Sequence, residues 1–330
     1  MDNLVSVIMP CFQAEQYLDM SIGSVYTQDY SQIELIVIND GSTDNSENKI
    51  LAWQKQFEEK GFVLKYIYQD NQGLGAAVNA GLKVVTGKYL TLLDADDRFL
   101  PGSIDLRAKY LDTHLECSGV RSNGWMIMGD EKRLFITEER EKKITDLFAA
   151  LTSGATNNWA GTYMVRTSVL FKTYTDRNIY PSRLGQNFQI LLPVAYQNKF
   201  GYIDVPLMEY FIYKNSHSHT EDLEAQYLLM EKNANGWKDI YVHVLEKIEK
   251  DAVIRQVYLN EYEAVWSRAG LHRAIRFDKT EAIHQYYKKL IGTGRATLTD
   301  RIVYYRLFRS PLVIPLKFAR RIKMMFSFLD

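Results

Sequence analysis

The sequence predicts an α/β protein, with a mostly parallel sheet flanked by helices and a helical C-terminal region after it. Three observations predict this class. Short apolar segments rich in β-branched residues alternate with segments of helical spacing over the first hundred residues. Apolar residues make up 46% of the 330-residue chain, enough for a substantial core. Beyond about residue 221 the spacing stays helical, with few Gly or Pro residues.

Local pattern places the elements of the first hundred residues. Residues 4–9 form an apolar strand that Pro10 ends, and residues 33–38 form a second strand. The other expected elements are helices over 14–28, 45–60 and 75–85, and strands over 62–68 and 88–93. Asp44 and Glu47 resemble a capping box that opens the second of these helices.

The pattern is looser after residue 100. We expect strands over 120–128 and 156–165, a helix over 187–198, and extended chain over 201–213. The expected organisation is an α/β domain over 1–218, with halves of about 1–100 and 101–218, and a helical region over 219–330.

Charge and cysteine content narrow the class of protein. Lys plus Arg equals Asp plus Glu at 40 each, which argues against a nucleic-acid partner. Cys11 and Cys117 make no disulfide framework, as in proteins of a reducing compartment. The start of the chain has no signal-type pattern, and no run of 18 apolar residues occurs. These features predict a cytoplasmic protein without a membrane-spanning helix.

Polar clusters follow the first four strands. They are Pro10-Cys11-Phe12, Asp40-Gly41-Ser42, Asp70-Asn71 and Asp94-Ala95-Asp96-Asp97. Because the carboxyl ends of parallel strands share one edge, the acids and one aromatic ring should converge there. Carboxylates suit Mg²⁺ or Mn²⁺, and such a cation neutralises a diphosphate. The plainer interpretation of Asp94–Asp97 is a solvated acidic turn.

Several segments together resemble the family 2 glycosyltransferases. The segments are residues 10–15, 34–44 and 71–81, and the Asp94–Asp97 cluster stands where that family has its D-x-D motif. The resemblance is close over about residues 4–100 and looser over 101–215. It implies a GT-A fold, a Rossmann-like sheet that binds a nucleotide-diphosphate sugar, usually a UDP-sugar.

The resemblance also implies a role for individual residues. Phe12 would lie near the base, Asp40 would accept a hydrogen bond from it, and Asp96 would ligate the divalent cation that holds the diphosphate. Asp97 would orient the donor sugar, and an acceptor hydroxyl would displace the nucleoside diphosphate with inversion. The implied nucleotide-sugar-binding residues are Pro10, Phe12, Glu15, Asp40, Asp70, Asn71, Gly73, Asn79, Asp94, Ala95 and Asp96.

Two positions depart from the family pattern. Val78 stands where the family often has Arg, which removes one phosphate or sugar contact. Gln186-Asn187 stands where the family commonly has Glu-Asp, whose Asp takes the acceptor proton, and an amide cannot serve as a general base.

Three interpretations of the missing base stay open. Asn187 holds the acceptor while another acid is the base, with Asp176 and Glu209 nearest in sequence. Alternatively the acceptor is already ionised, as a polyprenyl phosphate is, and no base is needed. In the third, the segment around Gln186-Asn187 aligns differently with the family, or the protein is catalytically weak. At the extreme, the protein would bind a nucleotide-sugar without catalysing its transfer.

Two further segments have candidate roles. His217 lies in Asn215–Thr220 and is a candidate for the metal shell or the diphosphate, the alternative being a polar linker. Trp159 and Tyr163 are candidates for stacking on an acceptor sugar beside Gln186 and Asn187, and a plain buried strand is the alternative.

The last thirty residues, 301–330, contain seven Lys or Arg residues among many apolar ones, and Asp330 is their only acid. A basic amphipathic helix fits an anionic membrane surface; the alternatives are a helix packed on its own domain and a homodimer contact. The sequence therefore predicts a metal-dependent, hexosyltransferase-type enzyme, peripheral at the inner face of the membrane, acting on a saccharide or lipid-linked acceptor in surface polysaccharide synthesis.

Overall fold

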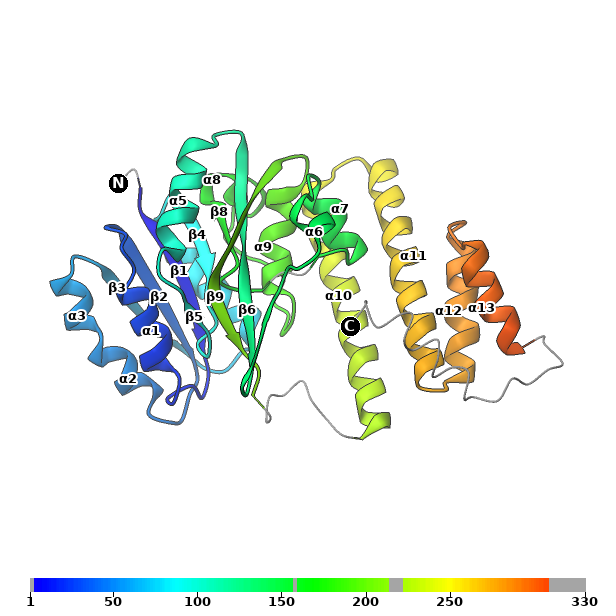
Figure 1. Cartoon of the computed structure of the whole chain (residues 1–330), viewed down its shortest axis with the longest axis horizontal. Helices are drawn as coiled ribbons and strands as arrows, with labels where there is room; N and C mark the ends of the chain where they lie inside the picture. The colour runs from blue at the N-terminus through cyan, green and yellow to red at the C-terminus, as the bar shows by residue number, and fades with distance from the viewer. Residues whose placement is uncertain (1–2, 157–158, 214–221, 309–330) are drawn as a thin grey trace. The chain divides into compact units, whose positions relative to one another are not determined.

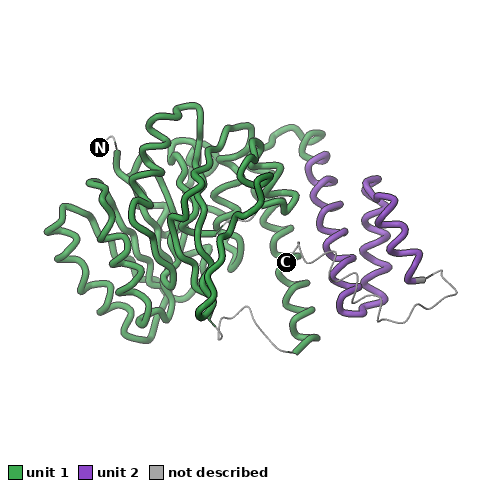
Figure 2. Tube along the Cα trace, viewed as in Figure 1, with its two compact units in different colours: residues 1–255 green, residues 256–330 purple. Residues whose placement is uncertain are grey.

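The computed structural model describes residues 3–156, 159–213 and 222–308 of the chain. It divides into two compact units, residues 1–255 and 256–330 (Figure 2). The expected domain boundary after residue 218 lies outside the described residues. The chain passes from unit 1 to unit 2 later, after Arg255, so the long helix over residues 223–248 belongs to unit 1.

Unit 1 is built on a nine-stranded mixed sheet in the order β3-β2-β1-β4-β8-β6-β9-β5, with β7 paired to β6 (Figure 1). Its strands are β1 (Val5–Cys11), β2 (Ile33–Asp40), β3 (Val63–Gln69), β4 (Tyr89–Leu92), β5 (Arg98–Phe99), β6 (Cys117–Met128), β7 (Glu131–Leu134), β8 (Tyr163–Arg166) and β9 (Lys199–Phe211). Its helices are α1 (Leu18–Tyr26), α2 (Ser46–Ala52), α3 (Gln54–Glu59), α4 (Leu74–Val84), α5 (Ser103–Thr113), α6 (Glu139–Lys142), α7 (Leu147–Ser153), α8 (Thr167–Thr173), α9 (Gln186–Ala195) and α10 (Leu223–Ile248).

The four N-terminal strands are parallel and in register, as the alternation of strands and helices predicts. Pro10 lies opposite Ile38, Ile8 lies opposite Leu92, and Asp40 lies opposite Gln69. The carboxyl ends of β1, β2, β3 and β4 therefore form one edge of the sheet, which we call the rim. Every polar cluster noted in the first hundred residues stands at this rim.

Both faces of this parallel sheet are covered, which explains its nearly continuous apolar strands. Val7, Met9, Leu35 and Val37 belong to one core cluster with residues of α1, α2, α3 and α5. Ile8 and Ile38 point to the other face, where α4 packs so closely that a Cβ on Gly81 would lie 3.0 Å from each of them.

The second half of the sheet and its helices depart from the predictions at several elements. The expected strand over 156–165 is only Tyr163–Arg166, because Gly161 has a φ of +79° and the Thr162 hydroxyl donates to the Trp159 carbonyl at 2.8 Å. Helices α5, α6, α7 and α8 and the short strands β5 and β7 were not predicted. The extended segment 201–213 is confirmed as most of β9.

The predicted capping box is wrong. Helix α2 begins after Asn45, which makes no side-chain cap, and the expected single helix breaks at Trp53 into α2 and α3. The carboxylate of Glu15 instead accepts from the Asn45 N–H at 2.6 Å, and Asp44 accepts from the Ser46 N–H at 3.1 Å. A carboxylate from the loop after β1 therefore supports the start of α2.

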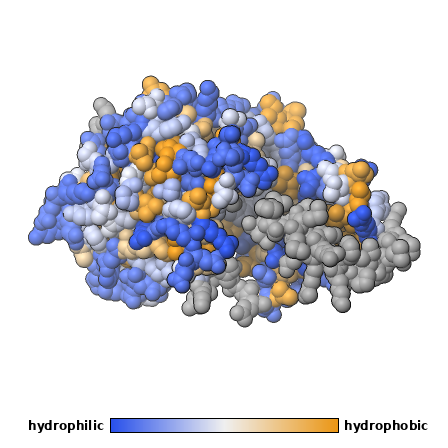
Figure 3. Space-filling model, viewed as in Figure 1, coloured by the Kyte–Doolittle hydropathy of each residue, from blue (hydrophilic) through white to orange (hydrophobic). Residues whose placement is uncertain are grey.

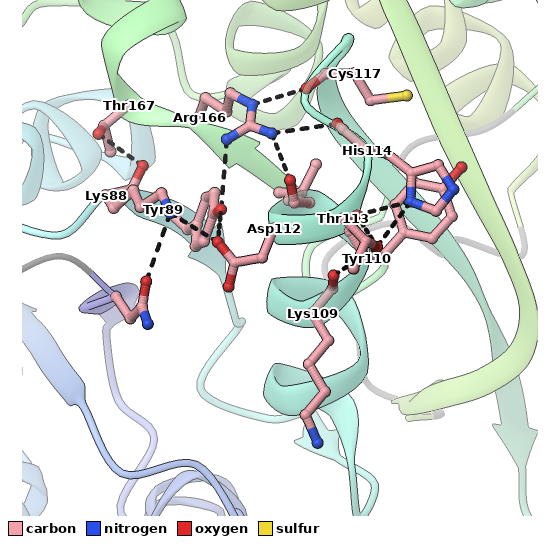
Figure 4. Close-up of polar contacts among 12 residues, drawn as sticks. Lys88, Tyr89, Lys109, Tyr110, Asp112, Thr113, His114, Cys117, Arg166 and Thr167 are labelled. Carbon is pink, nitrogen blue, oxygen red and sulfur yellow. Dashed lines mark hydrogen bonds and ion pairs between the residues drawn. The ribbon is translucent and has the colours of Figure 1, made fainter.

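The amino end of β4 is tied to its neighbours by a polar network around Arg166 (Figure 4). The Arg166 guanidinium donates to the Cys117 carbonyl at 2.8 Å and to the Leu111 carbonyl at 2.6 Å, and so joins β8 to the end of α5 and the start of β6. Lys88 and the Tyr89 hydroxyl both donate to Asp112 at 2.7 Å. This network holds the sheet from the end opposite the rim.

Unit 2 is helical, as predicted. It comprises most of α11 (Ala252–Arg276), all of α12 (Thr280–Gly292) and α13 (Leu298–Phe308). Its small core contains Ala264, Leu271, Ala274, Ile283 and Leu290. Over the part of the chain that the structure describes, no helix combines the length and the apolar character needed to cross a bilayer.

Candidate active site

The acid turn, Asp94–Asp97, follows β4 at the rim. The Asp97 N–H donates to the Asp94 carbonyl at 3.1 Å, which folds the segment back on itself. Asp94 and Asp96 are half-buried, whereas Asp97 is 1% exposed. The Phe211 N–H donates to Asp97 Oδ1 at 3.0 Å, and Asp97 Oδ2 has no hydrogen-bond partner among the described residues. The turn therefore brings carboxylate oxygens close together, and the surrounding described residues supply too few hydrogen-bond donors to satisfy all of them.

Burial and mutual repulsion make this turn costly to ionise. Burial, followed by the charge of Asp96, raises the pKa of Asp94 to about 7. Burial also raises the pKa of Asp96, and burial with the charges of Asp94 and Asp96 raises the pKa of Asp97 well above its usual range. A bound cation would relieve this repulsion. No described group of three or more His, Cys, Asp or Glu side chains forms a preformed metal site, so further ligands would come from elsewhere.

Aromatic residues that follow β1, and others at the end of β9 and just after it, flank the acid turn. Burial, with the charges of the three aspartates, raises the pKa of Tyr210 to about 12. The Tyr213 hydroxyl lies 3.5 Å from the Asp96 carbonyl oxygen, and its ring packs 4.6 Å from that of Tyr17. Phe12, after β1, is 51% exposed at the same rim. The rim thus has both the charge and the flat apolar surface that a nucleotide needs.

Three residues that were predicted to bind the nucleotide-sugar donor have side chains that are hydrogen-bonded within the protein. Both carboxylate oxygens of Asp40 are engaged: Oδ1 by Gln69 and the Gln72 N–H, and Oδ2 by the Gly73 N–H at 2.8 Å. The Asn79 amide donates to the Ile179 carbonyl at 3.0 Å and accepts from its N–H at 2.7 Å. The third, Glu15, supports α2 as described above. These side chains shape the rim, and a direct contact of each with a donor remains a prediction.

The other residues that were predicted to bind the nucleotide-sugar lie at the rim, as expected from the strand order. Pro10 is buried within β1, and Ala95 is buried inside the acid turn. Asp70 and Asn71 are exposed after β3, and an added Cβ on Gly41 would lie 2.7 Å from the Asn71 nitrogen. His217 lies outside the described residues.

The loop before α9 packs on the start of α4. The Gly75 N–H donates to the Ser182 carbonyl at 3.0 Å, and an added Cβ on Gly75 would lie 2.5 Å from that oxygen. An added Cβ on Gly73, whose φ is +89°, would lie 3.0 Å from Arg183 Cγ. The glycines therefore bring Arg183 over the rim. Sequence reasoning missed this residue, since nothing local marks Arg183 as close to Gly73.

The expected acceptor residues separate into two groups. Trp159 is stacked on Phe135, with ring centroids 4.0 Å apart, so one of its faces is already covered. Gln186 and Asn187 begin α9 and are each 8% exposed. The Tyr163 hydroxyl donates to Asn187 Oδ1 at 2.8 Å, and burial together with the charge of Asp94 raises the pKa of Tyr163. Tyr163 thus connects the acid turn to the start of α9.

The two acids considered as a base are engaged elsewhere. Glu209 accepts from Arg98 at 2.5 Å and from Lys132 at 2.9 Å, and these two cations hold its pKa below the usual value although burial opposes them. Asp176 lies 3.8 Å from Lys247, and hydrogen bonds from Asn178 with the charge of Lys247 lower its pKa against burial. Both are ion-paired carboxylates with reduced basicity.

Buried Arg107 helps to fix the strand that leads into the acid turn. Nothing in the sequence around Arg107 indicates this role. Its guanidinium donates to the Gly161 carbonyl at 2.8 Å and the Tyr163 carbonyl at 3.0 Å. The Thr91 hydroxyl also donates to the Tyr163 carbonyl, at 2.7 Å, and the Gly161 N–H donates to the Leu92 carbonyl at 2.6 Å. These bonds fix the start of β8 against the strand that leads into the acid turn.

The sheet order and the rim define a GT-A fold, and solved structures agree. The structure of S. aureus TarS 1–349 in complex with UDP-GlcNAc is 18% identical, covers 88% of this chain and 89% of its own, and has a TM-score of 0.59. The mannosyltransferase PcManGT from Pyrobaculum calidifontis, in complex with GDP-Man and Mn²⁺, is 14% identical, covers 99% and 88%, and has a TM-score of 0.53. At this identity the likeness shows the fold.

Residues 6–173, half of the chain, match the family model described as glycosyl transferase family 2, and the chain belongs to this family. An uncharacterized glycosyltransferase of Nostoc sp. is 34% identical over 155 residues, which is 47% of each chain. The glycosyltransferase GlyA of Streptococcus pneumoniae is 43% identical over 96 residues, 29% of this chain and 13% of GlyA. The chain thus spans less than half the length of either relative.

Proposed function

We propose that the chain is an inverting, divalent-cation-dependent glycosyltransferase that moves a sugar from a nucleotide-diphosphate sugar to a saccharide, glycolipid or lipid-linked acceptor. One observation carries this proposal. The acid turn stands at the carboxyl edge of a parallel sheet, the position at which such sheets bind ligands, and Asp97 Oδ2 has no hydrogen-bond partner in the described part of the chain. TarS in complex with UDP-GlcNAc shares the fold, which supports a UDP-sugar as donor.

The residues of the acid turn fit a hard divalent cation. The carboxylate oxygens of Asp96 and Asp94 are the ligands that Mg²⁺ and Mn²⁺ prefer, and their repulsion gives the ion a favourable place. When bound there, the cation would neutralise the diphosphate as it leaves. PcManGT contains Mn²⁺ beside GDP-Man, which is consistent with this assignment.

The chain's own residues position the reactants. The exposed ring of Phe12 stacks on the base, and the Gly73 loop held by Asp40 encloses the nucleotide. Asp97, fixed by the Phe211 N–H, orients the donor sugar. The oxygen of an acceptor hydroxyl then attacks the anomeric carbon from the side opposite the diphosphate and loses its proton, and the bond from that carbon to the diphosphate oxygen breaks with its electron pair going to the diphosphate. We place this step in the assembly of a surface polysaccharide or glycolipid.

Heat stability with a panel of UDP-sugars and Mn²⁺ tests the proposal. At a ligand concentration 100 times Kd, donor binding would stabilise the fold by about 2.7 kcal/mol. We expect one UDP-sugar to raise the Tm in the presence of Mn²⁺, and Asp96→Asn to abolish both this rise and UDP release. The control is Asp130→Asn, because Asp130 is exposed on the turn between β6 and β7. If Asp96→Asn kept the protection by Mn²⁺ and the full rate of UDP release, the assignment would be wrong.

A further inference from the structure

The inference concerns Arg183, whose side chain lies over the loop between β3 and α4. An added Cβ on Gly73 would lie 3.0 Å from Arg183 Cγ and 3.4 Å from its Nε, so the side chain runs directly past this glycine. Arg183 is exposed, and among the described residues its guanidinium has neither an ion-pair nor a hydrogen-bond partner. The N–H groups of this guanidinium are therefore available to a ligand at the rim.

Arg183 stands at the end of the rim away from the acid turn. The Gly73 N–H donates to Asp40 at the end of β2, so Arg183 lies beside the ends of β2 and β3. Strand β1 lies between β2 and β4, the strand that leads into the acid turn, so β2 and β4 are about 10 Å apart. Hydrophilic residues predominate on α2 and α3, which follow β2, on the face that Figure 3 shows. A ligand that lies along the rim can therefore have its charged part at the acid turn and a polar edge at Arg183.

The loops after β1 and β2 are joined between these two places. The Gln13 N–H donates to the Ser42 hydroxyl at 3.0 Å, and the Thr43 N–H donates to Gln13 Oε1 at 2.7 Å. Exposed Phe12, immediately before Gln13, is thereby held beside the end of β2. Because the acid turn is the proposed place of the diphosphate, the nucleoside extends from there across Phe12 toward the loop after β3. The outer edge of the base then faces Arg183.

Asp40, the residue expected to meet the base, is engaged by the loop instead. It is 4% exposed, and its carboxylate already accepts three hydrogen bonds, from the Gln69 side chain and from two backbone N–H groups. Val78, at the position where the family often has Arg, is fully buried in α4 and offers no polar group. A further polar partner for the base must come from another segment, and Arg183 is an exposed cation that the structure brings to this end of the rim.

The chemistry of the outer edge determines which base Arg183 can bind. In a pyrimidine nucleotide the ribose is attached to N1, so the group on C4 is the one farthest from the ribose and the diphosphate. This group is a carbonyl oxygen in uracil and an amino group in cytosine. A guanidinium only donates hydrogen bonds, so it can bind the oxygen and not the amino group. We infer that Arg183 binds O4 of a uracil base and so selects a UDP-sugar as donor; this rests on the proposed function.

Calorimetric binding of UDP, CDP and inorganic pyrophosphate to the full chain, each with Mn²⁺, tests the inference. We expect the wild type to bind UDP about tenfold or more tightly than CDP, since a hydrogen bond to a charged group discriminates by about that factor. Arg183→Ala should weaken UDP binding about tenfold and should not weaken the binding of CDP or pyrophosphate. Arg183→Lys should recover part of the affinity for UDP, because an ammonium group also donates. Arg140→Ala on exposed α6 is the control and should leave every Kd unchanged.

Three results would overturn the inference. They are an unchanged Kd for UDP in Arg183→Ala, a wild type that binds CDP as tightly as UDP, and an equal loss of UDP, CDP and pyrophosphate binding in Arg183→Ala. The last result would place Arg183 at the diphosphate. The ligand-free Tm of each variant checks that it is folded. Failure of the proposed function is distinct, because the wild type would then bind neither UDP nor pyrophosphate with Mn²⁺ and would consume no UDP-sugar.

Discussion

At the scale of single residues, the acid turn combines groups that repel one another at neutral pH. Within the described residues, Asp97 keeps one buried oxygen without a hydrogen-bond partner, and burial together with the charge of Asp96 raises the pKa of Asp94 to about 7. Unpaired buried groups reduce stability, and they concentrate at sites that bind ligands. The sequence showed that the three carboxylates exist, but not that the Phe211 N–H serves only one oxygen of Asp97.

Replacing Asp94 by Asn should stabilise the cation-free protein at high pH. The folded pKa of about 7 lies above the unfolded value near 3.9, so the folded state holds a proton that the unfolded state has lost. The free energy of unfolding therefore falls as pH rises through that window. Because Asp94 is half-buried, we expect a gain of about 1 to 2 kcal/mol at pH 8 in EDTA, and much less at pH 4.5.

Thermal melts at both pH values measure this effect, with Asp130→Asn as the exposed control. A gain that was the same at pH 4.5 and pH 8 would show that the charge of Asp94 is not its cause. Mn²⁺ should reverse the order of the two proteins at pH 8, because ionised Asp94 then contributes to cation binding.

At the scale of elements, glycines decide which segments approach the rim. Helix α4 and the segment Pro181–Arg183 are about a hundred residues apart in sequence, and Gly75 lets them touch. The sequence predicted the first four strands, their parallel order and their polar ends correctly, because alternation and β-branched runs are local signals. It did not predict α5, the break at Trp53, or the contact of Arg183 with Gly73, because tertiary packing decides these.

Gly75→Ala should displace Arg183. The added methyl group would lie 2.5 Å from the Ser182 carbonyl oxygen, so the loop must move and its hydrogen bond to the Gly75 N–H must lengthen. We expect a loss of about 1 to 3 kcal/mol in the free energy of unfolding, measured in urea. Gly292→Ala is the control, because nothing lies within 4 Å of an added Cβ there. A Gly75→Ala protein as stable as the wild type would mean that the close approach is not needed.

At the scale of the whole molecule, every candidate site residue that the structure describes belongs to unit 1. The sequence signals that carried the family assignment also lie there, since the family model ends at residue 173. Unit 2 has a small core and no motif of its own. The packing of its helices on one another could not be predicted, because helical periodicity alone does not determine which helices pack together.

The predicted membrane contact depends on residues 301–330, of which 301–308 are described. On α13 the side chains of Leu298, Ile302 and Leu307 are exposed apolar groups, and those of Arg301 and Arg306 are exposed cations between them. The exposed apolar and basic side chains of α13 are mixed around the helix and do not form two separate faces, so the described part does not by itself form the predicted amphipathic helix. The membrane contact stays a prediction for residues 301–330, where each basic residue near an anionic surface would contribute about 1 kcal/mol.

Co-sedimentation with vesicles tests this contact. The full chain should bind phosphatidylglycerol-containing vesicles, should bind pure phosphatidylcholine vesicles weakly, and should be released as salt rises, because salt screens the attraction. Deleting residues 301–330, or replacing Arg301 and Arg306 by Glu, should weaken binding to the anionic vesicles about tenfold or more. Neither change should alter the rise in Tm that the UDP-sugar causes in the presence of Mn²⁺. If the deletion variant bound anionic vesicles as well as the full chain, the tail would not be the membrane anchor. A change from dimer to monomer on deletion would favour the homodimer contact instead.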